Sequence, residues 1–352
     1  AEPGIETYPD CFYFRYLYAY VNGNNDLKEV FFMKLHKKHL LIALAFLLAF
    51  SLFITGCSSD APAEPVEPAE PAEPGAMTDN GEPEGGTIAI GTKNFTESIL
   101  LAHIFRVLIE ENTNMSVNIT ELGGTIIAFE ALQNNNIQMY PEYTGTGYIT
   151  LLEESEILPA DETYQIVQQE FQDRWGLTWM EPLGFNNTYT LALRQSMIDD
   201  LGLVTFSDLL DHDQNLSFGA TMEFVERDDG LPGLSALYGF EFGSVMDLDP
   251  GLMYTAVRSE DVDVISAFAT DGRIPAYELG ILEDDLNFFP PYFAAPLVRM
   301  DVLEQYPQLE ILNQLHNMID DETMANLNFQ VDEQGMTEDA VAREFLSSIG
   351  LI

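Results

Sequence analysis

The chain has 352 residues, with 58 acidic against 14 basic side chains, and its formal net charge of -44 falls entirely on the residues after Cys57. A field of this sign repels nucleic-acid phosphates and anionic lipid headgroups, so both are excluded as partner surfaces. Hydrophobic residues make up 46% of the chain and the only cysteines are Cys11 and Cys57, which excludes a disordered protein, a disulfide scaffold and a cysteine-based zinc site.

The N-terminal region has the features of a targeting segment. A basic patch, Lys34–His39, precedes an apolar run from Leu40 to Ile54. This run is shorter than the roughly 20 residues that cross a bilayer, but it suits the central region of a signal peptide. It ends in Ile54-Thr55-Gly56-Cys57, which resembles a bacterial lipobox, and the alternative is a short signal anchor with an incidental cysteine. We expect residues 33–57 to be a lipoprotein signal peptide with lipidation at Cys57, and residues 1–32 to be an upstream extension.

A Pro- and Glu-rich stretch follows the cysteine. Glu-Pro recurs every third residue from Glu64-Pro65 to Glu73-Pro74. Proline at this density favours extended polyproline II, and the repeated negative charge extends the chain further. We therefore expect residues 58–86 to be a spacer that holds a globular domain away from a membrane.

The next part of the chain alternates strands and helices. Thr87–Ile90 is a short apolar strand, and apolar residues then recur at helical spacing between Ile99 and Leu108. A strand around Val117–Ile119, a helix from Gly123 to Leu132 and a strand at Ile137–Tyr140 complete the pattern. This order predicts a parallel sheet whose faces are covered by helices.

The same order returns in the second half. The predicted strands are Tyr189–Arg194, Leu216–Ala220 and Val262–Phe268, and the predicted helices are Leu231–Tyr238 and Leu252–Arg258. The C-terminal stretches Val302–Ile319 and Asp339–Ile349 are predicted to be mostly helical. The residues after the spacer are enough for two α/β lobes of ordinary domain size.

The sequence contains no pattern typical of an enzyme. It lacks a Gly-x-Ser-x-Gly elbow, a His-Glu-x-x-His pair and a phosphate-binding glycine loop. His103, His212 and His316 are far apart and have apolar or helical neighbours. Carboxylate pairs are expected by chance in a chain with 58 acids. We therefore expect no catalytic residues, no metal and no cofactor.

Two basic residues are informative because bases are rare here. Lys93 is the single lysine after Cys57, and it lies just past the first predicted strand. Ligands of α/β proteins bind outside the carboxyl ends of parallel strands. Arg227 lies among acids in Glu226-Arg227-Asp228-Asp229. The alternatives are a surface lysine paired with an acid and an ordinary ion pair of the arginine.

Aromatic residues also occur in stretches rich in Pro and Gly. Tyr140–Gly147 contains two tyrosines where Pro and Gly disfavour regular structure, and Phe288–Phe293 is similar. Taken singly, each ring is more often part of a core than of a binding site. Together with a lysine and an arginine, the rings suggest a quaternary ammonium ligand, because aromatic faces attract diffuse cations. The two bases would hold an accompanying carboxylate.

Several segments resemble those of the glycine betaine/choline-binding lipoproteins of osmoprotectant ABC transporters, in the same order and spacing from about Thr87 to the C-terminus. The segments are Gly91–Glu97, Leu122–Thr125, Tyr140–Thr146, Thr270–Ile274 and Phe289–Tyr292. The resemblance implies an α/β type II periplasmic-binding-protein fold, in which two lobes joined by two crossovers enclose a ligand cleft. Lobe 1 would comprise residues 87–186 and 290–352, and lobe 2 residues 187–289.

The resemblance also implies a ligand site. Its aromatic cage would be formed by Tyr143, Tyr189, Tyr292 and, where the family often has tyrosine, Phe268. The carboxylate of the ligand would be held by Lys93, Thr146 and Arg227, with Asn187 beside the cage. Ser98 and Gln138 depart from the residues common in the family, and Ser98 leaves the preference between choline and betaine open.

The implied function is capture of a quaternary ammonium osmolyte outside the cell and its delivery to a membrane permease with its ATPase. Glycine betaine is the expected ligand. Choline, carnitine or another betaine are alternatives, as is a membrane-tethered sensor built on the same lobes. The strongly acidic composition also suggests a saline habitat.

Overall fold

The computed structural model describes residues 85–352. The predictions for the upstream extension, the signal peptide with Cys57 and nearly all of the spacer lie outside these residues. Within residues 85–352, no helix combines the length and the apolar character needed to cross a bilayer.

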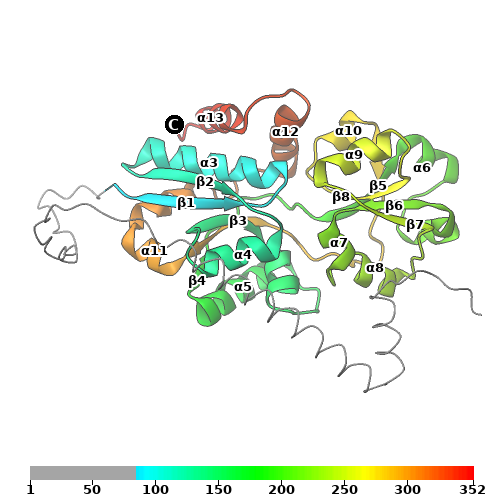
Figure 1. Ribbon diagram of the computed structural model, residues 1–352, viewed down its shortest axis with the longest axis horizontal. Coiled ribbons are helices and arrows are strands. Elements are labelled where there is room, and N and C mark those ends of the chain that lie inside the picture. The colour runs from blue at the N-terminus through cyan, green and yellow to red at the C-terminus, as the bar shows by residue number, and fades with distance from the viewer. Residues whose placement is uncertain (1–84) are drawn as a thin grey trace, which may run out of the picture. The chain divides into compact units, whose positions relative to one another are not determined.

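Two five-stranded mixed sheets organise the described chain (Figure 1). The first has the strand order β2-β1-β3-β10-β4. Its strands are β1 (Thr87–Thr92), β2 (Ser116–Glu121), β3 (Met139–Tyr143), β4 (Leu177–Trp179) and β10 (Ala294–Arg299). The strands β1, β2 and β3 are parallel, as predicted, whereas β10 runs antiparallel between β3 and β4. A strand from late in the sequence thus completes the first sheet.

Helices cover both faces of this sheet. They are α3 (Thr96–Asn112), α4 (Thr125–Gln133), η1 (Thr146–Leu151), α5 (Ala160–Trp175), α11 (Met300–Gln305), η4 (Pro307–Leu315), α12 (Asp321–Asp332) and α13 (Glu338–Ser348). Most of α3 is buried, because it packs against the sheet on one side and against α12 and α13 on the other. Helices α4 and α5 lie on the opposite face (Figure 1).

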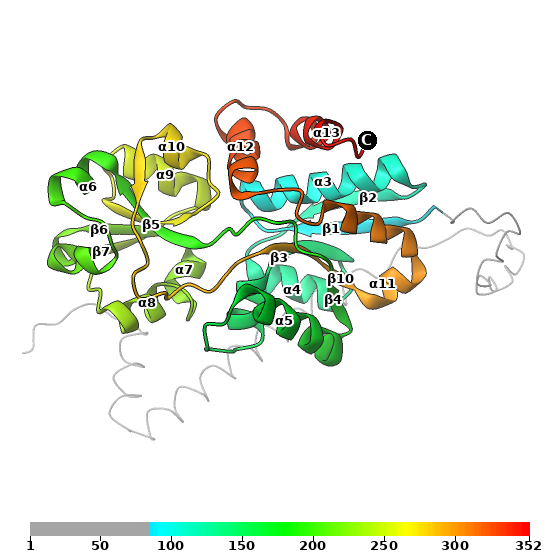
Figure 2. The ribbon, with the colours of Figure 1, turned by 180° about the vertical axis from the view of Figure 1, so that it is seen from behind.

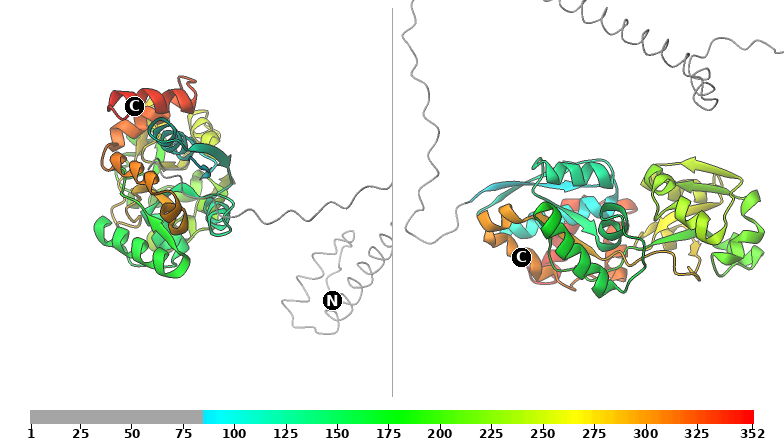
Figure 3. Two further views of the ribbon diagram at one scale, coloured as in Figure 1. Left: turned by 90° about the vertical axis from the view of Figure 1, so that its left-hand side faces the viewer. Right: turned by 90° about the horizontal axis from the view of Figure 1, so that it is seen from below.

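The second sheet has the strand order β7-β6-β8-β5-β9. Its strands are β5 (Tyr189–Arg194), β6 (Ser217–Ala220), β7 (Ser244–Asp247), β8 (Val264–Phe268) and β9 (Leu279–Ile281). The strand β6 is parallel to β7 and β8, and β5 is antiparallel to β8 and β9. The helices of this half are α6 (Gln195–Leu201), η2 (Ser207–Asp211), η3 (Asp213–Asn215), α7 (Met222–Glu226), α8 (Leu231–Tyr238), α9 (Pro250–Arg258) and α10 (Arg273–Ala276). The helices of each half stay beside their own sheet (Figure 3). The buried hydrophobic clusters are also separate for the two halves, and the partly buried Tyr189 and Phe289 pack against a cluster of each.

The chain crosses between the two sheets twice, after β4 and again after β9 (Figure 2). The two crossing segments pair with one another. Asn186 and Phe293 form an antiparallel bridge, and the backbone N–H of Asn187 donates to the carbonyl oxygen of Tyr292 at 3.1 Å. The predicted fold class, two α/β lobes joined by two crossovers, is confirmed.

The structure corrects several local predictions. The strand predicted to end at Tyr140 continues through Pro141 to Tyr143 in β3, where the sequence predicted no regular structure. Its Pro141 lies opposite Pro296 of β10, and β3 pairs with β1 only at Met139, so the missing proline N–H is tolerated there. The helix predicted over Val302–Ile319 is divided into α11 and a 3₁₀ segment, because Pro307 cannot continue the helical hydrogen bonds. The sequence analysis predicted no helix at the position of α5.

Candidate ligand-binding cleft

A cleft of about 500 Å³ lies between the two lobes and is lined by residues of both. It brings together all eight predicted binding residues: Lys93, Tyr143, Thr146, Asn187, Tyr189, Arg227, Phe268 and Tyr292. Lys93 directly follows β1, and Tyr143 and Phe268 are the last residues of β3 and β8. Tyr189 and Thr146 are the first residues of β5 and η1, and Arg227 directly follows α7. Asn187 and Tyr292 lie on the two crossing segments. The sheet edges and the crossovers therefore position the site, as expected for α/β proteins.

The aromatic side chains form a continuous wall. Tyr189 and Phe268 are directly opposite in the β5–β8 register, with ring centroids 5.2 Å apart. Tyr292 meets Tyr189 edge to face at 5.6 Å, and Phe95 stacks on Phe268 at 5.2 Å. Tyr143 adjoins Phe95 at 6.2 Å. The prediction missed Phe95 as a lining residue, although its place between Lys93 and the start of α3 was a usable signal.

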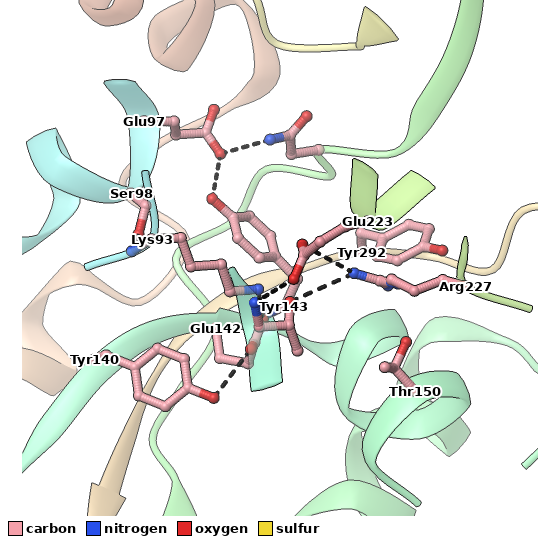
Figure 4. A network of polar contacts seen from close by, with 12 residues as sticks. Lys93, Glu97, Ser98, Tyr140, Glu142, Tyr143, Thr150, Glu223, Arg227 and Tyr292 are labelled. Carbon is pink, nitrogen blue, oxygen red and sulfur yellow. Dashed lines mark hydrogen bonds and ion pairs between the residues drawn. The ribbon is translucent and has the colours of Figure 1, made fainter. Parts of the chain in front are cut away.

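Tyr143 is fixed by a buried carboxylate. Glu97, in the first turn of α3, is 3% exposed and accepts hydrogen bonds from Tyr143 Oη at 2.8 Å and Asn187 Nδ2 at 2.8 Å (Figure 4). Two further donors are Thr270 Oγ1 and Asn328 Nδ2. Burial raises the pKa of Glu97, although the four donors act in the opposite direction. Because Thr270 follows β8 and Asn328 lies on α12, this carboxylate connects the two lobes.

Lys93 is already paired within the protein. Its Nζ lies 2.6 Å from Glu142 Oε1, and both residues are buried, at 4% and 0% exposure. The other Glu142 oxygen accepts from Tyr140 Oη at 3.0 Å (Figure 4). The same Nζ is 5.4 Å from the centroid of the Tyr143 ring. Lys93 is thus paired with an acid, as the alternative had it, but it is buried rather than at the surface, and its side chain also lines the cleft.

Arg227, directly after α7, is held in the same way. Its Nε donates to Asp229 Oδ1 at 2.7 Å, and its Nη2 bonds the other carboxylate oxygen. Tyr292 Oη donates to this Asp229 at 2.7 Å. Burial raises the pKa of Asp229, but the charge and hydrogen bonds of Arg227 and the bond from Tyr292 outweigh it, so the pKa is lowered. The remaining nitrogen, Nη1, faces Thr125 Oγ1 at 3.4 Å.

Glu223 reaches across the cleft from α7 to the start of α4. Its Oε1 accepts the backbone N–H of Thr125 at 2.5 Å, and its Oε2 lies 3.8 Å from Arg227 Nη1 (Figure 4). Gly124 permits this approach, because a Cβ there would lie 1.9 Å from Oε1. The cleft lining contains four carboxylates, Glu223, Glu226, Asp247 and Asp249, against the two bases. None of these acids was predicted as a site residue.

The two departures from the family pattern lie behind the cleft. Ser98 is fully buried, and its Oγ accepts the backbone N–H of Lys93 at 2.9 Å. Gln138 Oε1 accepts the backbone N–H of Ala89 at 2.7 Å. Neither is among the residues that line the cleft. Ser98 therefore supports the loop that carries Lys93.

Comparison with known proteins gives a match over residues 86–348 to the family described as the substrate-binding domain of the ABC-type glycine betaine transport system, OpuAC. The chain belongs to this family. Members are substrate-binding components of ABC importers, and their role is solute binding rather than catalysis. The two-lobed fold is that of the family's type II binding proteins.

Two curated relatives and one solved structure illustrate the match. The chain is 34% identical over 314 residues to the carnitine transport binding protein OpuCC of Listeria monocytogenes, covering 88% of this chain and 96% of that protein. It is 34% identical over 266 residues to the ergothioneine transport permease/ergothioneine binding protein EgtU of Helicobacter pylori, covering 75% of this chain but about half, 48%, of that protein. The solved structure, a glycine betaine/carnitine/choline ABC transporter protein, shares 32% identity at a TM-score of 0.64 and covers 76% of this chain and 99% of its own.

Proposed function

We propose that this OpuAC-family protein captures a quaternary ammonium osmolyte outside the cell, with glycine betaine as the first candidate, and delivers it to the permease of an ABC importer. The observation that carries the proposal is the aromatic wall. Tyr143, Tyr189, Phe268 and Tyr292 line one cleft together with Phe95. A trimethylammonium group is too diffuse a cation for strong hydrogen bonds, and aromatic faces are the environment that binds it best.

The carboxylate of glycine betaine would lie on the opposite side of the cleft. Arg227 Nη1 and the start of α4 meet there, and a helix N-terminus beside a guanidinium group favours an anion. Thr146 and Asn187 add polar side chains, both buried, to the same lining, and Lys93 adds a second base. This division of the cleft supports the cage and carboxylate roles proposed for these residues.

The test is isothermal titration calorimetry of the wild-type protein with glycine betaine, choline, carnitine, ergothioneine and proline at one fixed high salt concentration. We expect binding of at least one quaternary ammonium ligand and none of proline. Tyr189→Leu keeps an apolar side chain but removes the central ring of the wall. It should weaken every quaternary ammonium ligand by up to about 2 kcal/mol, or roughly 30-fold.

The matched control is Tyr306→Leu, which removes a half-buried tyrosine that packs on the core of lobe 1, away from the cleft lining. This variant should bind like the wild type. If the wild-type protein binds no quaternary ammonium compound, or if both tyrosine variants bind equally well, the proposed ligand class is wrong.

We further propose that lipidation of Cys57 anchors the protein to the outer face of the cell membrane, with the Pro/Glu-rich spacer between anchor and lobes. The apolar run and the lipobox-like Ile54-Thr55-Gly56-Cys57 support this reading. Cys57→Ser should release the protein from membranes without a change in ligand affinity. A variant that still sediments with membranes after a carbonate wash would show that the anchor is not this cysteine.

A further inference from the structure

Glu223 occupies the part of the cleft best suited to a ligand carboxylate. Its Oε1 accepts the Thr125 N–H at 2.5 Å, and its Oε2 lies 3.8 Å from Arg227 Nη1. A helix N–H and a guanidinium nitrogen are the groups that bind carboxylates most strongly. The protein thus places one of its own carboxylates on the groups that a betaine carboxylate would use.

Positive charge in the cleft is already matched by negative charge. Among the residues that line the cleft, Lys93 is paired with Glu142 and Arg227 with Asp229. Both of these acids are buried. A zwitterionic ligand that binds Arg227 Nη1 therefore either displaces Glu223 or brings its own carboxylate close to that of Glu223. A ligand that carries only the cation requires no such displacement, and it gains the attraction of the Glu223 charge.

We propose that Glu223 is a specificity-determining residue that sets the charge preference of the cleft, disfavouring zwitterionic betaines relative to cationic ligands with the same trimethylammonium group. This inference rests on the proposed function, because it needs a site that binds quaternary ammonium compounds. It concerns the ratio of the two affinities, whichever ligand binds more tightly.

Two variants remove the competing carboxylate in independent ways. Glu223→Gln keeps the shape of the side chain and removes its charge. Gly124→Ala keeps the charge and displaces the carboxylate, since the added Cβ would lie 1.9 Å from Oε1 and 2.3 Å from the carboxyl carbon. The backbone at Gly124, with φ of -79°, suits alanine. The matched control is Glu226→Gln, another carboxylate of α7 in the cleft lining.

The experiment is calorimetric titration of the wild type and the three variants with glycine betaine and with choline, at one fixed salt concentration. The readout is the ratio of the two dissociation constants. We expect Glu223→Gln and Gly124→Ala to shift this ratio towards glycine betaine by at least about tenfold. The control Glu226→Gln should shift it by less than about threefold, because that charge is not placed on the Thr125 N–H.

The outcomes separate the inference from the proposed function. If the wild-type protein binds neither ligand, the proposed function fails. If it binds either ligand and the ratio stays unchanged in both Glu223→Gln and Gly124→Ala, the role of Glu223 is refuted while the function stands. An equal shift in Glu226→Gln would also refute it, because the effect would then come from the overall charge of the cleft.

Discussion

Arg227→Gln is the substitution that best separates the two ends of the proposed ligand. Arg227 contributes Nη1 to the cleft and uses Nε and Nη2 to hold Asp229. Removing the guanidinium group therefore has two consequences, one for the ligand carboxylate and one for the buried Asp229 carboxylate. These consequences have different signatures in binding and in stability.

For glycine betaine we expect a loss of about 2–5 kcal/mol in binding free energy, the usual cost of removing one partner of a desolvated charge pair. Choline has no carboxylate and should lose much less. Part of the loss for choline is offset, because its cation is attracted by the Asp229 carboxylate that Arg227 no longer neutralises. The folded state should lose about 3–5 kcal/mol, since Asp229 is 3% exposed and, among residues 85–352, keeps only Tyr292 and Thr150 as side-chain donors.

The assays are calorimetric titration with both ligands and thermal unfolding without ligand. The double variant Arg227→Gln/Asp229→Asn serves as the matched control, because it replaces the ion pair by two neutral amides. It should recover a large part of the lost stability, because no buried charge is left unpaired. It should not recover glycine betaine affinity, because the guanidinium group is still absent.

Equal losses for choline and glycine betaine in Arg227→Gln would refute this reasoning. They would show that the arginine supports the structure of the cleft and does not bind the carboxylate. Failure of the double variant to regain stability would separately show that the unpaired Asp229 charge is not the cause of the destabilisation.

Three further predictions concern other parts of the structure. Phe268→Tyr should leave the affinity for quaternary ammonium ligands within a few-fold of wild type, whereas Phe268→Leu should weaken binding by up to about 2 kcal/mol. Equal affinities of the two variants in calorimetric titration would contradict a cation–π role of this ring. Because burial raises the pKa of Glu97 above its ordinary 4.5, the folded state holds that proton more tightly than the unfolded chain, and the stability of the wild type should fall relative to Glu97→Gln as the pH rises above this value. Melting curves of the two proteins that keep a constant separation from pH 4 to pH 8 would be inconsistent with this. The net charge of -44 should make the melting temperature rise between about 0.05 M and about 1 M NaCl, because the Debye length shrinks to about 3 Å at the higher concentration. A melting temperature that stays constant or falls with salt would show that charge repulsion does not limit stability.

Much of the fold was predictable, because strands and helices with strong apolar periodicity form from local sequence. The parallel strands β1, β2 and β3 and the long helix α3 were found in this way. The insertion of β10 between β3 and β4 was not, because it depends on pairing between residues more than a hundred positions apart. The continuation of β3 through Pro141 to Tyr143 was missed for a related reason, since the strands beside Pro141 make its absent N–H harmless and they are not visible in the local sequence.

The candidate site shows a similar division. Lys93 and Arg227 were predictable because bases are scarce in this chain, and Tyr143 and Tyr292 because they lie in stretches rich in Pro and Gly. Tyr189 and Phe268 lie in strands and were predicted only through the resemblance to the family. Their acidic partners Glu97, Glu142, Glu223 and Asp229 were not, because 58 acids give any single carboxylate little significance in the sequence. Only the three-dimensional pairing distinguishes them from the many acids of the solvated surface. The pairing of acids with bases in the cleft is therefore visible only in the structure.

The register of the two sheets bears on how tightly a ligand can be held. Tyr189 and Phe268 are opposite residues of one antiparallel pair, and Tyr143 is paired with Ala294, two residues after Tyr292. The Tyr189 and Phe268 rings are thus preorganised by the backbone of a single sheet, and a hinge motion between the lobes leaves their spacing unchanged. Binding then costs little side-chain entropy, and affinity depends mainly on the angle between the lobes. Substitutions in the crossing segments at positions other than Asn187 and Tyr292 should therefore tune affinity over a wide range without altering any residue that lines the cleft.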